Sequence, residues 1–369
     1  MRRKSWHWIA LLLAAVVGTG FATVYLLNLK KHKKVAHLPP VTARHGTNSA
    51  TTSSMPSPPA THPRPSTGST SSSAPASSPS TGPAGVPAAS RLDAAGAAAA
   101  LKKGLDLLKH GHLIDARTQL SAAILSDHLS ARQEKQARAE LTKLAQKTIF
   151  SDEAVEGDPY TYYYTVRAGD KLDPLERRER LRVPDQLILK VNGLSQPTDI
   201  RCGSRIKLVR GPFHAIISKS RFTVDLVLQR EDLPPIWVAQ VRCGLGNEKK
   251  TPTPLGAWRV GTDAGGSVAV GGKLAHPPWT PTDSSALAGD GPILYGQPGY
   301  ALGAKGLWIG LVGIDDQTRG KAHYGIHSTS EPASIGKEQS LGCIRLADED
   351  IDLVYSLLYE VHSTVQIRP

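Results

Sequence analysis

The first 92 residues contain no aspartate or glutamate, although nine lysines and arginines precede residue 91. The chain as a whole has 44 Lys and Arg against 32 Asp and Glu, so 35 basic and 32 acidic residues remain in 91–369. The net charge of +12 therefore belongs mainly to the N-terminal part. Because a nucleic-acid-binding domain needs its basic residues on a folded face, the composition argues against a nucleic-acid partner.

Residues 6–29 lack all four charged residue types. As a helix, this segment would span roughly 36 Å, enough to cross a hydrocarbon core of about 30 Å. We expect residues 1–37 to form an N-terminal tip and a transmembrane helix (6–29). The alternative is a cleaved signal peptide, but the apolar region of a signal peptide is usually shorter. With either outcome, we expect most of the chain to be exported.

Apolar side chains are nearly missing from the next segment. Ser, Pro, Thr, Ala and Gly fill 40 of the 45 positions in 46–90. Such a chain buries too little to offset the entropy of ordering, so residues 38–90 are predicted to be a disordered linker.

Residues 91–150 show helical periodicity. Leu101, Leu105 and Leu108 recur at i, i+4 and i+7, and further apolar stripes indicate up to three helices. The segment is somewhat like a tetratricopeptide helix pair, but one copy is too few for an array. A helical hairpin or three-helix element is expected, with peptide binding as an open alternative.

From Gly211 onward the pattern is mainly that of short strands, so a mostly β domain is expected at 211–369. We expect strands at Phe222–Leu228, Trp237–Cys243, Leu307–Val312, Tyr324–His327 and Thr364–Arg368. A helix is expected at Asp350–Tyr359, with acidic residues near its start.

The strongest chemical signal lies in residues 324–346, YGIHSTSEPASIGKEQSLGCIRL, where His327 precedes Cys343 by 16 positions. An imidazole near a thiol can take its proton and generate a nucleophilic thiolate. Gly342 would let the backbone approach the reacting centre, where N–H groups could stabilise an oxyanion. Arg345 offers a cation for a substrate carboxylate.

This string resembles the signature of L,D-transpeptidases of the YkuD type, which runs from a His through a Ser or Thr to a Gly-Cys pair followed by Arg or Asn. TPTPLGAW (251–258) and SIG (334–336) also recur in that family, so the resemblance covers about residues 212–368. It implies that Cys343 is the nucleophile and His327 the general base. It also implies support of substrate or oxyanion by Ser340, Gly342, Arg345, Ser328 and Tyr324. Leu341 stands where many members carry a second His, and Ser328 where Gly is frequent.

Residues 160–210 resemble a LysM module, a β-α-α-β unit that binds glycans containing N-acetylglucosamine. The matching features are the opening YTVRAGD, the central Asn192 and Gly203 before a closing strand at Ile206–Val209. An opening strand is expected at Tyr164–Arg167. Lys171 replaces a small hydroxyl residue that is usual in the family, and packing against the next domain is the alternative to glycan binding.

The His and Cys residues allow two other interpretations. His323, His327 and Cys343 could bind a metal, but no second Cys or carboxylate completes a zinc signature. No metal and no cofactor are therefore expected. Cys202 and Cys243 could form a disulfide in an exported chain or remain buried thiols.

The resemblances together imply a multidomain, membrane-anchored peptidoglycan L,D-transpeptidase. Its partners would be peptidoglycan stem peptides and glycan strands, and its reaction a 3→3 cross-link made through a cysteinyl thioester. It would cross the inner (cytoplasmic) membrane once, with its C-terminal domains in the periplasm or cell-wall space. The alternatives are an L,D-carboxypeptidase with the same Cys-His site and a non-catalytic wall-anchoring protein.

Overall fold

The computed structural model describes residues 92–261, 272–281, 289 and 291–369. The expected transmembrane helix (6–29) and the linker (38–90) lie outside these residues. Among the helices that are described, none combines the length and the apolar character needed to cross a membrane.

The helical region forms as its periodicity predicts. It consists of α2 (Ala94–Lys109), α3 (Leu113–Ile124) and α4 (Ala131–Ala145), and α4 continues into the π-helical turn η2 (Gln146–Phe150). Asp93 caps α2 by accepting a hydrogen bond from the Gly96 backbone N–H at 2.7 Å. A capping box between Ser130 and Gln133 starts α4.

A β-α-α-β module follows. It contains β1 (Thr161–Thr165), α5 (Leu172–Glu179), α6 (Asp185–Val191), the short η3 (Pro197–Asp199) and β2 (Arg205–Val209). β1 and β2 pair antiparallel, with Thr161 opposite Val209. The first strand thus begins three residues before the expected Tyr164. It also ends earlier, because the Arg167 N–H donates to the Asp170 carboxylate (2.8 Å) in a turn.

Buried charges join this module to the helical region. The fully buried Lys207 of β2 directs its Nζ toward backbone carbonyls at 2.9–3.1 Å, those of Thr148, Ile149, Ser151 and Glu153. Arg117 of α3 forms a buried bidentate ion pair with Asp158, with both N–O distances at 2.8 Å. Because buried charges need such partners, these contacts fix how the two parts meet.

The C-terminal part is a mixed sheet closed on itself. Its strands are β3 (Phe213–Ser218), β4 (Thr223–Leu228), β5 (Ile236–Gly246), β6 (Gly256–Val260), β7 (Gly272–Ala275), β8 (Leu307–Gly313), β9 (Tyr324–Ser328), β10 (Glu338–Ser340), β11 (Ile344–Leu346) and β12 (Thr364–Arg368). The neighbours run β5-β11-β9-β8-β6-β12-β3-β4, and pairing of β4 with β5 closes the barrel. β7 adds to β8, and β10 adds to β5. The short η4 (Pro332–Ser334) and the helix α7 (Asp348–Leu357) complete this part; α7 begins two residues earlier than expected.

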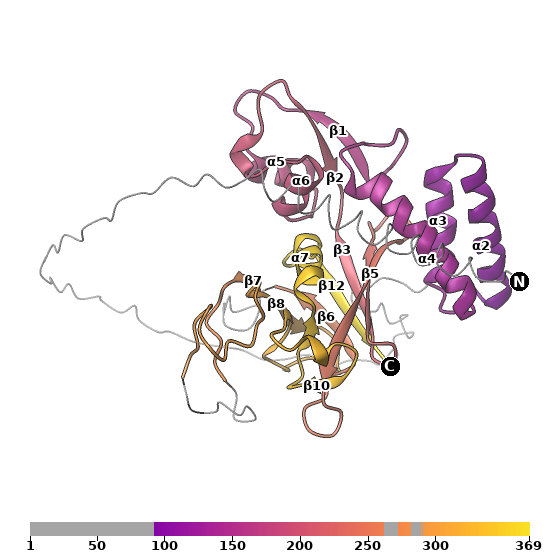
Figure 1. Ribbon diagram of the computed structural model, residues 1–369. Helices are drawn as coiled ribbons and strands as arrows, with labels where there is room; N and C mark the ends of the chain where they lie inside the picture. Colours follow the sequence, from indigo (N-terminus) through magenta and orange to yellow (C-terminus); the bar gives the residue numbers. More distant parts are fainter. Residues whose placement is uncertain (1–91, 262–271, 282–288, 290) are drawn as a thin grey trace, which may run out of the picture. The chain divides into compact units, whose positions relative to one another are not determined.

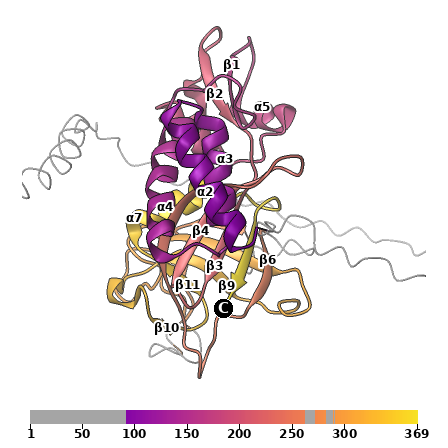
Figure 2. The same cartoon turned by 90° about the vertical axis from the view of Figure 1, so that its right-hand side faces the viewer.

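Strands β3 and β4 are buried along their whole length, including Thr223 and Asp225 of β4. Val224, Leu226 and Leu228 belong to the barrel core, whereas Val227 packs in a second cluster with side chains of α2–α4. Figure 1 and the view turned by 90° in Figure 2 both place the helices beside these strands. The apolar stripe of the helical region therefore covers the outside of the barrel.

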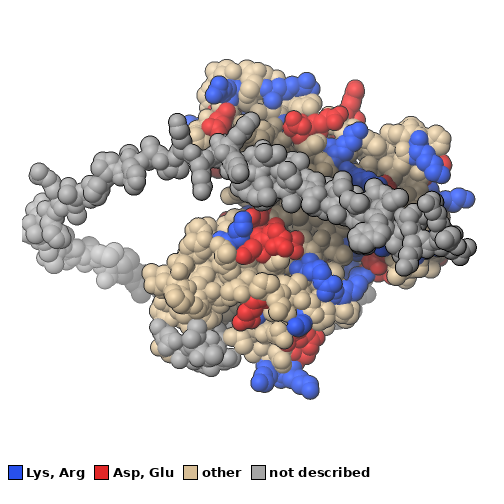
Figure 3. Space-filling model, viewed as in Figure 1, with Lys and Arg blue, Asp and Glu red and all other residues tan. Residues whose placement is uncertain are grey.

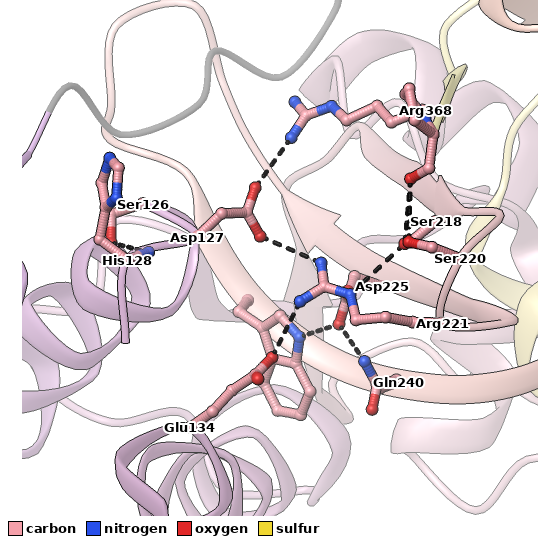
Figure 4. A network of polar contacts seen from close by, with 12 residues as sticks. Ser126, Asp127, His128, Glu134, Ser218, Ser220, Arg221, Asp225, Gln240 and Arg368 are labelled. Atoms are coloured by element: carbon pink, nitrogen blue, oxygen red, sulfur yellow. Dashed lines mark hydrogen bonds and ion pairs between the residues drawn. The ribbon is translucent and has the colours of Figure 1, made fainter. Parts of the chain in front are cut away.

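Ion pairs accompany this apolar contact. Basic and acidic side chains are interspersed over the face seen in Figure 3. In the network of Figure 4, Arg221 lies between Asp127 (3.0 Å) and Glu134 (3.3 Å) of the helical region. Asp225, only 6% exposed, accepts hydrogen bonds through Oδ1 from Arg138, Trp237 and Gln240 at 2.5–3.0 Å.

Cys202 and Cys243 do not form the disulfide that the sequence allows. Both thiols are free; Cys202 is exposed before β2, and Cys243 is fully buried among the apolar residues of the barrel core. A side chain enclosed in that core is out of reach of a surface loop.

The buried pair between Arg138 and Asp225 gives a stability prediction. Arg138→Ala should lower the free energy of unfolding by about 3 kcal/mol, because it leaves the Asp225 carboxylate buried without its cation. Lys143→Ala on the same helix removes a pair with Glu140 whose side chains are 71% and 30% exposed, and should cost less than about 0.5 kcal/mol. Urea unfolding of both variants measures the difference, and equal losses would contradict the prediction.

Candidate active site

Cys343 lies in the tight turn between β10 and β11, and Ser340 braces that turn. The Ser340 hydroxyl donates to the Cys343 carbonyl (2.6 Å) and accepts from the Gly342 N–H (3.2 Å). Ser340 is 2% exposed, so its hydroxyl holds the turn and does not face a substrate. The Gly342 N–H is likewise engaged within the turn, which differs from the expected support of an oxyanion.

Gly342 is required by its conformation and by its neighbours. Its φ of +116° is one that L side chains rarely adopt, and an added Cβ would lie 2.9 Å from Cε1 of Tyr324. The Tyr324 ring itself packs on Trp258, with ring centroids 5.2 Å apart. The Tyr324 ring thus packs against the turn that carries Cys343 (residues 341–343), which is called the nucleophile turn below.

A buried threonine from the segment 251–258 holds the same turn. The Thr253 hydroxyl donates to the Gly342 carbonyl (2.9 Å) and accepts from the Gly246 N–H at the end of β5 (2.8 Å). Thr253 is 1% exposed. It therefore ties the nucleophile turn to the barrel through two backbone groups.

Parallel pairing of β11 with β9 brings the cysteine and the histidine together. Arg345 lies opposite His327 and Ile344 opposite Ile326. The two isoleucines are fully buried. Because side chains alternate along a strand, Arg345 and His327 lie on the other face, and the Gly325 N–H, two residues before His327, donates to the Cys343 thiol.

The tautomer of His327 follows from one hydrogen bond. Its Nδ1 lies 2.5 Å from the Ser328 carbonyl oxygen, which can only accept, so Nδ1 carries the proton and donates. Nε2 of the neutral ring is then left with a lone pair, as a general base requires. The Trp308 ring stacks on the imidazole with centroids 5.8 Å apart and planes at 20°, which fixes the ring orientation further.

The Cys343 thiol and the His327 imidazole are both neutral at neutral pH. Burial lowers the pKa of His327 to about 4, opposed by its bond to Ser328 and reinforced by the charge of Arg345. Burial raises the pKa of Cys343 to about 11, although the Gly325 N–H and Arg345 both favour the thiolate. The site therefore holds a thiol and an unprotonated imidazole at neutral pH, not a preformed thiolate–imidazolium pair.

The thiol and the imidazole are not hydrogen-bonded to each other among the described residues. The Cys343 thiol donates instead to the His323 carbonyl at 3.6 Å. His323, which has a left-handed φ of 65°, thus contacts the thiol through its backbone carbonyl. Within the described residues, no three His, Cys, Asp or Glu side chains form a group that could hold a metal ion.

Arg345 is already paired. Its Nη1 lies 2.7 Å from Oε2 of Glu331, and the two side chains are 16% and 66% exposed. The guanidinium is held on β11 while its partner lies on the exposed loop before η4. A substrate carboxylate would have to replace Glu331 to bind Arg345 as the sequence predicts.

Ser328 differs from its expected role. Its side chain is fully buried, and its hydroxyl donates to the Leu302 carbonyl at 2.7 Å. It therefore anchors the loop before β8, and only its backbone carbonyl serves the site, by orienting His327.

Sequence reasoning missed Thr253, Trp308 and Glu331. Thr253 lies in the quoted segment TPTPLGAW and could have been suspected on that ground. Trp308 lies opposite His327 on β8, a register that only the folded sheet supplies. No local signal marks Glu331 as the partner of Arg345.

Comparison with known proteins concerns the domain that contains this site. The YkuD family model, which describes an L,D-transpeptidase catalytic domain, matches residues 212–367. The YkuD proteins of Bacillus subtilis (strain 168) and Bacillus licheniformis are 46% and 44% identical to this chain over 54 residues. These stretches cover 15% of this chain and 27% of each relative, so the chain spans about a quarter of the length of the curated relatives it matches. Residues 212–367 are thus a catalytic domain of the L,D-transpeptidase family, a family of enzymes.

Solved structures are more distant. An L,D-transpeptidase from Mycobacterium smegmatis is 13% identical, with a TM-score of 0.29 over 45% of this chain and 64% of its own. L,D-transpeptidase 1 of Mycobacterium tuberculosis is 14% identical, with a TM-score of 0.26 over 46% and 67%. At such values the likeness carries no argument about this chain.

The raised pKa of Cys343 predicts how alkylation depends on pH. Because only the thiolate reacts, modification by iodoacetamide should be slow at pH 7 and rise up to about tenfold per pH unit through pH 9. Peptide mass mapping after timed reaction measures it, with the exposed Cys202 of the same chain as the internal comparison. A rate at Cys343 that is already constant between pH 6 and 8 would show a preformed thiolate and contradict the prediction.

Thr253→Val should loosen the nucleophile turn, because it removes both bonds of the Thr253 hydroxyl while keeping the shape of the side chain. We expect a loss of about 1–3 kcal/mol in stability and a roughly tenfold slower reaction at Cys343 with an acylating inhibitor. Thr318→Val is the control, because this buried threonine bonds Ala257 and Asp315 and not the turn. It should lose stability and keep the rate; a Thr253 variant that behaves the same way would contradict a positioning role.

Proposed function

We propose that this protein is a peptidoglycan L,D-transpeptidase that forms 3→3 cross-links through a thioester on Cys343. The observation that carries the proposal is the fixed tautomer of His327, whose unprotonated Nε2 belongs to the same site as a protonated thiol. A structural histidine has no need of this arrangement. The family of residues 212–367 supplies the class of reaction.

In the first step, the donor is a tetrapeptide stem whose third residue is a diamino acid. Nε2 of His327 takes the proton of the Cys343 thiol as Sγ attacks the carbonyl carbon of residue three. The bond to the terminal D-alanine breaks, and its amine leaves with the proton returned by the imidazolium. Because the Cys343 thiol and the His327 imidazole are both neutral before the reaction, proton transfer and nucleophilic attack are concerted.

In the second step, an amine of a neighbouring stem attacks the thioester. The amide bond forms, His327 accepts the proton of the amine, and Cys343 leaves as the thiol. Water in place of the amine would give an L,D-carboxypeptidase, so the acceptor alone separates the two activities.

The remaining parts suit an enzyme that acts on the wall. The module at 160–210 has the β-α-α-β order of LysM modules, and we propose that it binds the glycan strand. Residues 6–29 would anchor the chain in the inner membrane, and the linker 38–90 would let the C-terminal part reach the wall.

Acylation of Cys343 tests the proposal. Incubation of the purified full-length chain with a carbapenem should add one inhibitor mass to the wild type and none to Cys343→Ala, by intact-mass spectrometry. Cys202→Ser is the control and should be acylated like the wild type. A folded wild type that forms no adduct would overturn the proposal and favour a wall-anchoring protein.

The product of the reaction identifies the acceptor. Wild-type protein incubated with tetrapeptide muropeptides should give a 3→3 dimer by chromatography and mass spectrometry. Tripeptide monomers alone would show that water is the acceptor and would contradict transpeptidation.

A further inference from the structure

A hollow of 430 Å³ lies where the β-α-α-β module meets the barrel. Its lining includes the end of α5, the link between β2 and β3, and the turn between β4 and β5. Four of the lining side chains are arginines: Arg180, Arg182, Arg210 and Arg230. No part of the active site described above lines it.

Two of these arginines have no carboxylate partner among the described residues. Arg182 and Arg230 pair with Glu231 (3.5 Å) and Asp232 (2.9 Å), whereas neither Arg180 nor Arg210 takes part in an ion pair. Arg210 does make a side-chain hydrogen bond with Tyr162, but a guanidinium carries five N–H donors. The donors that remain on Arg180 and Arg210 are suited to bind an anion with two oxygens.

Arg210 is held in place by its surroundings. Its guanidinium carbon lies 4.0 Å from the centroid of the Tyr162 ring, and the Tyr162 hydroxyl donates to Glu179 at 2.9 Å. A fixed guanidinium loses little freedom when it binds, so its donors are already positioned.

The backbone around the hollow is also constrained. Arg180 and Arg182 both adopt positive φ values, 52° and 54°, which are uncommon outside glycine. Gly211 allows the chain to cross closely here, since an added Cβ would lie 2.6 Å from the Arg182 carbonyl oxygen. Arg180 is the left-handed C-cap that ends α5. The two conformations together fix where the chain places these arginines.

Three carboxylates also line the hollow, those of Glu179, Glu231 and Asp232, and they limit the kind of ligand that it can bind. Glu179 already accepts the hydrogen bond of Tyr162. Glu231 is 90% exposed and Asp232 62% exposed at the side chain. Their contacts with arginine are at the surface and therefore weak. A ligand that carries both a carboxylate and an ammonium group could pair its carboxylate with the arginines and its ammonium group with Glu231 and Asp232.

The hollow is remote from the nucleophile. The turn that lines it precedes Ile236, the first residue of β5, whereas Gly246 at the other end of β5 would contact Gly342 through an added Cβ at 2.8 Å. Ten residues of strand span roughly 30 Å. A single stem peptide at Cys343 would not also fill the hollow, but a polymer with repeated stems could occupy both.

We propose that this hollow is an exosite that binds a second stem peptide of the wall polymer. Arg180 and Arg210 hold a carboxylate of that stem, and Glu231 and Asp232 face the side-chain ammonium of its diamino acid. The inference rests on the proposed function for the identity of the polymer. The proposed exosite binds the substrate but takes no part in the chemical step.

The test measures binding of a tetrapeptide muropeptide to the full-length chain by isothermal titration calorimetry. The active site is first blocked with the carbapenem. Arg180→Gln with Arg210→Gln should weaken binding about tenfold or more. The matched control is Arg201→Gln with Arg205→Gln, which removes two charges from the same module outside the hollow, including an arginine stacked on Tyr163 at 3.6 Å. The control should bind like the wild type.

Two further arms define the ligand. A muropeptide whose diamino-acid amine is acetylated should bind more weakly, and inorganic phosphate should compete only poorly, because it lacks the ammonium group. Equal binding by the two double variants, no binding by the wild type, or binding of phosphate without the muropeptide would each overturn the proposal. Carbapenem acylation of Cys343 should be unchanged in Arg180→Gln/Arg210→Gln. The binding measurement therefore tests the exosite, and the acylation measurement tests the proposed reaction separately.

Discussion

Parallel pairing of β9 with β11 is the interaction on which the site depends. It places Arg345 opposite His327 and brings the Gly325 N–H to the Cys343 thiol. These strands have five and three residues, too short to hold their register alone. The register is maintained because Ile326 and Ile344 are locked in the barrel core and because Thr253 and Ser340 fix the turn between β10 and β11.

Burial sets the protonation states of Cys343 and His327. The same low-polarity surroundings that raise the pKa of Cys343 lower that of His327, so both groups stay neutral. Because only the thiolate is nucleophilic, a Cys343 thiol with a raised pKa reacts slowly with electrophiles at neutral pH. Arg345 favours the thiolate, and its pairing with Glu331 moderates that influence.

The parts outside the barrel contribute by covering and connecting it. Without α2–α4, the outward side chains Ile216, Val227 and Trp237 would be exposed on β3, β4 and β5. The helical region therefore has a structural task, and its single-copy resemblance to a tetratricopeptide pair does not indicate an array. Lys207 and the Arg117–Asp158 pair connect the β-α-α-β module to the same helices, which sets the module beside the barrel and creates the arginine-lined hollow.

The sequence by itself determined the local features: the helices of 91–150, the last strand at Thr364–Arg368, and the motif that makes Cys343 and His327 the candidate catalytic residues, because periodicity and motif are carried by residues close together in the chain. Only the tertiary structure decided which residues far apart in the sequence contact each other. It buried both faces of β4, left Cys202 and Cys243 unpaired, turned the Ser328 hydroxyl toward Leu302 and gave Arg345 the partner Glu331. Those outcomes depend on the register of the closed sheet and on which surface the helices cover, and neither is encoded within any one segment.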